Sequence, residues 1–215
     1  MKNKNSFILW IIIIGLFAGF IAVVALSSNS EEEVADTNVK SQQTLYIQQA
    51  PDEKVVITEY SDFQCPACAN MHQILQQARE EFGGEVSFAF RHFPLTSIHP
   101  NAMTAHRLAA AADQQGLFAE VHDTLFETQQ LWASVVNPSD AITQLLTDAI
   151  PSLDGDLLQQ TAASSDIMQA IQRDMTNGMN VGIIGTPTLF IGDMQLQIRS
   201  YADLQTILIE QLEQS

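Results

Sequence analysis

The hydrophobic pattern divides the chain into three parts. Residues 7–26 form an apolar run without a charge, and residues 27–44 are polar and acidic with no apolar periodicity. From residue 45 to 215, short apolar runs alternate with amphipathic stretches, which is typical of a globular α/β domain. We therefore expect an anchor at 1–26, a flexible linker at 27–44 and a folded domain at 45–215.

The apolar run predicts a membrane helix. A helix of this length spans roughly 30 Å, which is the thickness of a bilayer core. Lys2 and Lys4 precede the run and an acidic stretch follows it. The positive-inside rule then places residues 1–6 in the cytoplasm and the domain outside it, with the chain held at the cell membrane by one span. A cleaved signal peptide is the alternative.

The folded part begins with a strand, a helix and a second strand. Val55–Tyr60 is a short β-rich run, residues 65–82 carry apolar residues near helical spacing, and Gly83 ends this helix. Residues 86–93 alternate between apolar and other side chains, which indicates a strand. This order predicts a parallel βαβ unit.

A helical block and a second β-rich unit follow. The pattern is helical from about residue 100 to 180, with predicted helices at 101–115, 117–130 and 166–177 and a helix that starts at Asn137-Pro138. Residues 186–199 read as two strands joined by a turn at Gly192-Asp193. Ser200 and Asp203 resemble a capping box that opens a last helix.

The charge of the chain argues against a nucleic-acid partner. The formal net charge is −16, and Lys and Arg together number only 9. A nucleic-acid-binding surface requires clustered basic residues that displace counterions. We therefore exclude that class of function.

The two cysteines of the chain are Cys65 and Cys68, at the predicted junction of strand and helix. Unpaired N–H groups and the positive end of the helix dipole favour a thiolate there, so Cys65 should have a lowered pKa and act as the nucleophile. Cys68 should be more buried and close a disulfide with it. A zinc site would need more ligands than this pair offers, and a haem attachment motif needs His where Ala69 stands. A purely structural disulfide would close too small a loop to add much to the stability of the fold.

Four motifs, "DFQCPAC", "FRHFPL", "HPNA" and "GTPT", resemble the DsbA-like thiol:disulfide interchange proteins over about residues 45–215. The resemblance implies a thioredoxin-like fold with an inserted all-helical domain at about 100–180. It implies Cys65 as the attacking sulfur, Cys68 as the resolving sulfur and Pro187 as a cis-proline facing them. Ala67 departs from the His that often precedes the second cysteine, which leaves the oxidising strength open.

The implied function is the introduction of disulfides into exported proteins outside the cytoplasm. Its partners would be unfolded exported proteins with thiols and a membrane quinone-linked oxidase, and no organic cofactor or metal is needed. Two alternatives remain: a reductase or isomerase that uses the same cysteines, and a membrane-tethered chaperone-like module that binds unfolded peptides.

Two further site residues come from the resemblance combined with strand position. Glu59 lies six residues before Cys65, where the family often has an acid, and a central strand should bury it, raise its pKa and let it exchange protons with Cys68. The alternative is a solvated carboxylate at the strand end. We expect a cis Thr186–Pro187 bond whose Thr186 backbone pairs with an extended substrate.

Several polar residues receive no chemical role from the sequence. We expect His72 to be a partly exposed helix residue. His92, His99, His106 and His122 have no ligand spacing and should pack or face solvent. Asp62 is expected to be a turn or cap residue.

Overall fold

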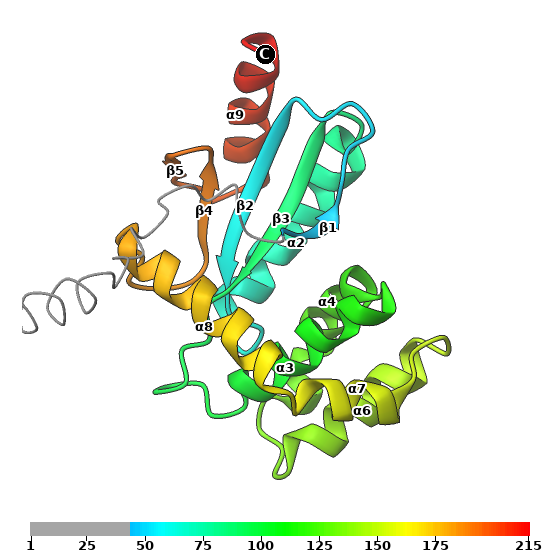
Figure 1. The fold of residues 1–215 in the computed structure, drawn as a ribbon. Coiled ribbons are helices and arrows are strands. Elements are labelled where there is room, and N and C mark those ends of the chain that lie inside the picture. Colours follow the sequence, from blue (N-terminus) through cyan, green and yellow to red (C-terminus); the bar gives the residue numbers. More distant parts are fainter. Residues whose placement is uncertain (1–43) are drawn as a thin grey trace, which may run out of the picture. The chain divides into compact units, whose positions relative to one another are not determined.

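The structure is a computed structural model that describes residues 44–215. A five-stranded sheet with the order β1-β3-β2-β4-β5 forms its centre (Figure 1). β2 and β3 are parallel, as the βαβ pattern predicts, and the other neighbouring strands are antiparallel. The strands are β1 (Leu45–Gln48), β2 (Val55–Ser61), β3 (Val86–His92), β4 (Thr188–Ile191) and β5 (Met194–Leu196).

Helices cover both faces of the sheet. In Figure 1, α8 (Ser165–Asn180) crosses in front of β2 and β3, and α2 (Pro66–Phe82) lies behind them. A Cβ at Gly178 of α8 would come within 2.8 Å of the Phe93 ring, so the absent side chain permits this close approach. α9 (Tyr201–Glu213) starts with the predicted capping box of Ser200 and Asp203 and packs with α2.

The remaining helices gather beyond the carboxyl ends of β2 and β3 (Figure 1). Buried leucines, valines and isoleucines fill the space between them, and this core is continuous with that of the sheet. The helices are α3 (Ala102–Ala112), the 3-10 turn η2 (Asp113–Gln115), α4 (Phe118–Glu127), α5 (Gln129–Trp132), α6 (Pro138–Ala149) and α7 (Gly155–Ala162).

Three expectations about local structure need correction. The alternation in residues 86–93 suggested two different faces, but every residue of β3 is buried, because both sides of this strand are covered. The predicted helix 117–130 is two helices separated at Thr128, and 101–115 ends in a 3-10 turn. The sequence also favours Asn137 as an N-cap residue whose side chain would cap α6; Asn137 does precede α6, but its φ of 58° places it in the left-handed region and its side chain caps nothing.

The predicted anchor at 1–26 and nearly all of the linker lie outside the described residues. Within 44–215, none of the helices has the length and apolar character that a membrane span requires.

Candidate active site

Cys65 and Cys68 lie where β2 leads into α2. Cys65 has an extended backbone and is the N-cap residue, and Pro66 occupies the first helical turn, where its missing N–H costs nothing. Both cysteines are free thiols. Cys65 is 7% exposed and Cys68 is fully buried, so Cys65 is the sulfur that a substrate can reach.

The start of α2 stabilises the Cys65 thiolate. A hydrogen bond from the Cys68 thiol, helped by the backbone N–H groups of Cys68 and Ala67, lowers the pKa of Cys65 to about 5, although burial opposes this shift. These N–H groups are the ones that a helix leaves unpaired in its first turn. Cys65 is therefore almost entirely thiolate at neutral pH, which is the nucleophilic form.

The surroundings of Cys68 and Glu59 raise their pKa values, in contrast to those of Cys65. Burial, the hydrogen bond to Cys65 and the nearby charges of Glu59 and Cys65 raise the pKa of Cys68 well above its usual value. Glu59 is 1% exposed, and burial raises its pKa to about 7. Ser61 Oγ donates to Glu59 Oε1 at 2.8 Å, while Oε2 has no partner in the described part of the chain. The alternative of a solvated carboxylate is thus wrong.

The loop before β4 faces Cys65 from the other side. The Thr186–Pro187 bond is cis, as the resemblance implied. Cys65 Sγ lies 3.6 Å from the Thr186 carbonyl oxygen and donates to it when the thiol is protonated. The Thr186 side chain also lowers the pKa of Cys65. Pro187 lines a cleft of about 440 Å³ between α2 and the β4–β5 hairpin.

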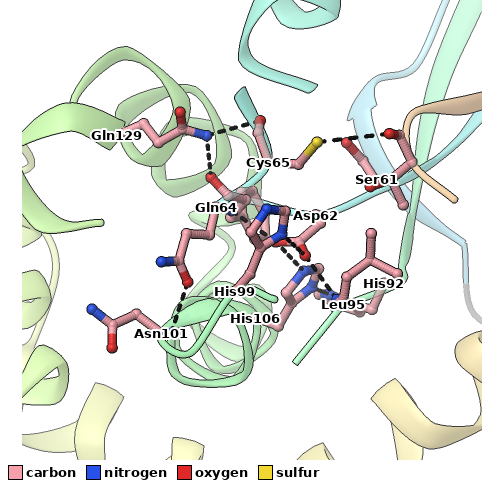
Figure 2. Close-up of polar contacts among 12 residues, drawn as sticks. Ser61, Asp62, Gln64, Cys65, His92, Leu95, His99, Asn101, His106 and Gln129 are labelled. Carbon is pink, nitrogen blue, oxygen red and sulfur yellow. Dashed lines mark hydrogen bonds and ion pairs between the residues drawn. The ribbon is translucent and has the colours of Figure 1, made fainter. Parts of the chain in front are cut away.

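The loop that carries Cys65 is held by a polar network that the sequence did not reveal (Figure 2). Asp62, expected to be a turn or cap residue, does form a turn, and it is also fully buried and accepts three hydrogen bonds. Gln129 of α5 donates to the carbonyls of Phe63 and Cys65 at 2.8 and 3.0 Å. The signal available in the sequence was that the motifs "DFQCPAC", "FRHFPL" and "HPNA" all contribute to this network.

His72 is more buried than the sequence suggested, and His92, His106 and His122 are packed inside the protein. His72 is 3% exposed, so its expected partial exposure is wrong; burial against α4 lowers its pKa to about 4. Burial also lowers the pKa of His92 to about 3, and those of His106 and His122 fall for the same reason. These four side chains are therefore neutral at physiological pH.

One group in the described part of the chain has the composition of a metal site. Ligand-type atoms of His72, His122 and Asp123 lie within 4.8 Å of one another. However, Arg79 Nη2 donates to Asp123 Oδ2 at 2.9 Å, and His122 Nδ1 lies 2.8 Å from Oδ1. Because a guanidinium already neutralises this carboxylate, we assign no metal to the group.

Comparison with known sequences gives the family of the chain. A family model described as thioredoxin matches residues 25–210. Among curated proteins, a Na(+)/H(+) antiporter NhaA 1 from Mycolicibacterium gilvum is 30% identical over 148 residues, which are 68% of this chain and 23% of the antiporter. The chain thus spans less than a quarter of the length of this relative.

Solved structures share the fold. Oxidised BdbD from Bacillus subtilis superposes with a TM-score of 0.68 at 17% identity, over 77% of this chain and 91% of that one. The alpha-DsbA1 protein of Wolbachia pipientis gives 0.66 at 20% identity, over 80% and 92%. The chain therefore belongs to the thioredoxin family, and its fold is that of the DsbA-like thiol:disulfide oxidoreductases.

Proposed function

We propose that this protein is an extracytoplasmic thiol:disulfide oxidoreductase that introduces disulfides into exported proteins. The observation that carries the proposal is the contrast between its two sulfurs. Cys65 keeps 7% of its surface exposed and has a pKa lowered to about 5, whereas Cys68 is fully buried with a raised pKa. A stable Cys65 thiolate is a good leaving group and favours the reduced form of the protein, which is what makes a dithiol an oxidant.

The reaction begins with the oxidised protein, in which Cys65 and Cys68 are joined. A substrate thiolate attacks the Cys65 sulfur, forming a mixed disulfide and releasing Cys68 as a thiolate. A second substrate thiolate then attacks the substrate sulfur of this mixed disulfide. The substrate leaves with a disulfide, and Cys65 leaves as a thiolate; the protein has gained the two electrons.

Glu59 has the properties of the proton donor for Cys68. A buried thiolate with a raised pKa must take up a proton as it leaves, and burial keeps bulk water away. Glu59, with a pKa of about 7, holds a proton in a large fraction of molecules at neutral pH. In the reverse step, when the pair is re-oxidised, the same carboxylate can remove the proton from Cys68.

The cleft beside Pro187 suits an extended and unspecific substrate. Its walls carry apolar side chains from α2 and from the segment after β4, namely Met71, Ile74, Leu196 and Ile198. The backbone of Thr186 lies beside the Cys65 sulfur, where it can pair with a substrate strand. Main-chain pairing does not depend on the substrate sequence, as an enzyme with many clients requires.

The deciding measurement is the equilibrium of the Cys65–Cys68 pair against glutathione. An oxidant should have a potential above about −200 mV, towards the value near −120 mV of a strong oxidase. A potential near about −270 mV, typical of a thioredoxin reductant, would overturn the assignment as an oxidase and favour the reductase alternative.

Two cysteine variants separate the enzyme from a chaperone-like binding module. Cys65→Ser should abolish the oxidation of a reduced, unfolded protein with two cysteines. In the matched variant Cys68→Ser, the Cys65 thiolate should attack a disulfide of an oxidised substrate, release one substrate thiolate and stay trapped in the mixed disulfide, because the resolving sulfur is gone. If the double variant retained the full effect on substrate folding, the protein would act as a holdase instead.

The location and the re-oxidising partner belong to the same proposal. The apolar run at 7–26 and the preceding Lys2 and Lys4 support a single-pass anchor with the catalytic domain outside the cytoplasm. We expect the protein to remain in washed membranes, with protease reaching the domain only from outside. In membrane vesicles, re-oxidation of the cysteine pair should depend on quinone; a soluble mature form or quinone-independent re-oxidation would contradict these points.

A further inference from the structure

Residues 62–65 form the short loop that presents the reactive Cys65 sulfur. Hydrogen bonds to a small number of side chains hold this loop in place. Cys65 N donates to the Asp62 carbonyl at 3.0 Å, which closes a turn. Within this turn, the Asp62 carboxylate accepts from Gln64 N at 2.8 Å through Oδ1. A side chain that accepts from the backbone two residues later makes an Asx-turn, which aspartate forms readily.

The other carboxylate oxygen of Asp62 reaches a distant part of the chain. Oδ2 accepts from Leu95 N at 2.7 Å and lies 2.8 Å from His99 Nδ1, so it connects the Cys65 loop to the segment after β3 (Figure 2). The carboxylate is 0% exposed, whereas the His99 side chain is 15% exposed. A buried carboxylate is costly unless donors surround it, and here the donors come from two segments that must both be in place.

We propose that Asp62 is the positioning residue for Cys65. Its carboxylate holds residues 62–65 in the turn that places the Cys65 sulfur against the N–H groups at the start of α2. The interaction with Leu95 and His99 prevents this turn from opening. The proposal rests on Cys65 being the reactive sulfur of the proposed oxidoreductase, but it concerns the ionisation of Cys65, which can be measured whatever the direction of the redox reaction.

Positioning and simple charge make opposite predictions for Asp62→Asn. If Asp62 acted only as a negative charge near Cys65, removing that charge would favour the thiolate and lower the Cys65 pKa. If Asp62 positions the loop, the single oxygen of the Asn amide cannot accept both from Gln64 N and from Leu95 N with His99, so the loop loosens and the Cys65 pKa rises. We expect a rise of about one unit, which is about a tenfold loss of thiolate below the pKa.

Asp174→Asn is the matched control. Asp174 is also buried, accepts from a backbone N–H, that of His92, at 3.0 Å, and pairs with a cation, Arg91, at 3.3 Å. No hydrogen bond found for it reaches residues 62–65. Both substitutions should lower the melting temperature, but only Asp62→Asn should move the Cys65 pKa. This comparison separates positioning from a general loss of stability.

The experiment follows the alkylation rate of Cys65 against pH in the full reduced chain, at a temperature where each variant is folded. An increased Cys65 pKa in Asp62→Asn with an unchanged value in Asp174→Asn supports the proposal. An unchanged or lowered pKa in Asp62→Asn overturns it, even if the protein proves to be an active oxidase. Should Asp62→Asn fail to fold, His99→Ala removes one donor from the same carboxylate; a smaller rise in the Cys65 pKa is expected, and no rise contradicts the proposal.

Discussion

Glu59 and Asp62 are two buried acids at the carboxyl end of β2: Glu59 lies within the strand and Asp62 directly follows it. Their surroundings give them different tasks. Glu59 has one donor, Ser61, and an oxygen without a partner in the described part of the chain. Asp62 accepts from Gln64, Leu95 and His99. The first carboxyl is poised to hold or release a proton, whereas the second is bound on all sides and connects segments. Burial alone therefore does not predict what an acid does; the number of donors around it decides.

The largest expected effect is on the free energy of unfolding. At pH 8, Glu59→Gln should stabilise the protein, whereas Asp62→Asn should destabilise it. Burial raises the pKa of Glu59 from 4.5 to about 7, so between these pH values the folded protein holds a proton that the unfolded chain releases. Stability should thus fall as pH rises through this window and stay lower above it, by on the order of 3 kcal/mol at about 1.4 kcal/mol per pKa unit.

Chemical denaturation of the oxidised protein checks this, because the disulfide removes the opposing titration of Cys65. Glu59→Gln should lose most of the decrease between pH 5 and pH 8 and be more stable than the parent at pH 8. Asp62→Asn should be less stable at both pH values, by about 1.5–3 kcal/mol for charge-assisted hydrogen bonds. A parent and a Glu59→Gln variant with the same pH profile would show that Glu59 ionises normally.

A smaller effect is expected on the exchange rate. Glu59→Gln cannot donate or accept the proton of Cys68, so re-oxidation and release of Cys68 should slow about tenfold near pH 7 and lose their dependence on a group of pKa about 7. Stopped-flow measurement of both steps from pH 6 to pH 8 tests this. Glu120→Gln, at an exposed position, is the control because it makes the same change in charge. Unchanged rates in Glu59→Gln would remove Glu59 from the mechanism.

The smallest effect is expected from Ser61→Ala. The Ser61 hydroxyl lowers the pKa values of both Glu59 and Cys68 by hydrogen bonding. Its removal should raise the pH midpoint of the Glu59-dependent rate by less than about one unit, at a cost near 1 kcal/mol in stability. The pH–rate profile of the variant measures the shift; a midpoint that moves to lower pH would mean that Ser61 stabilises the protonated acid.

Site residues could be predicted from the sequence where the feature they form is built by neighbouring residues. Cys65, Pro66 and Cys68 were assigned from the sequence because a helix start is a local event, built by residues next to one another. The pair β2 and β3 and the capping box of Ser200 were predictable for the same reason, since each depends on a short pattern. Glu59 and Pro187 came from the family resemblance; in the structure the charge of Glu59 acts on Cys68, and Pro187 directly follows the Thr186 carbonyl that lies beside the Cys65 sulfur.

The exposure of His72 was misjudged, and the burial and distant partners of the turn residue Asp62 were missed, because these surroundings come from elsewhere in the chain. The donors to Asp62 include Leu95 and His99, which lie more than thirty residues away in the sequence. His72 looked exposed on its helix, but α4, from the helical block, covers it and its ring stacks on Phe126. Neither contact can be predicted from the hydrophobic periodicity of the residues around Asp62 or His72.

By itself, the sequence determined the βαβ unit, the last two strands with the helix that follows them, and the place of the two thiols at the start of α2, but not β1 or the division of the helical block. Chain neighbours suffice for these features, because turns, caps and helix dipoles act over a few residues. Only the tertiary structure decided the ionisation of Cys68 and Glu59 and the task of Asp62. Those depend on how much water is excluded and which donors lie near, and both are set by segments that meet only when the chain has folded.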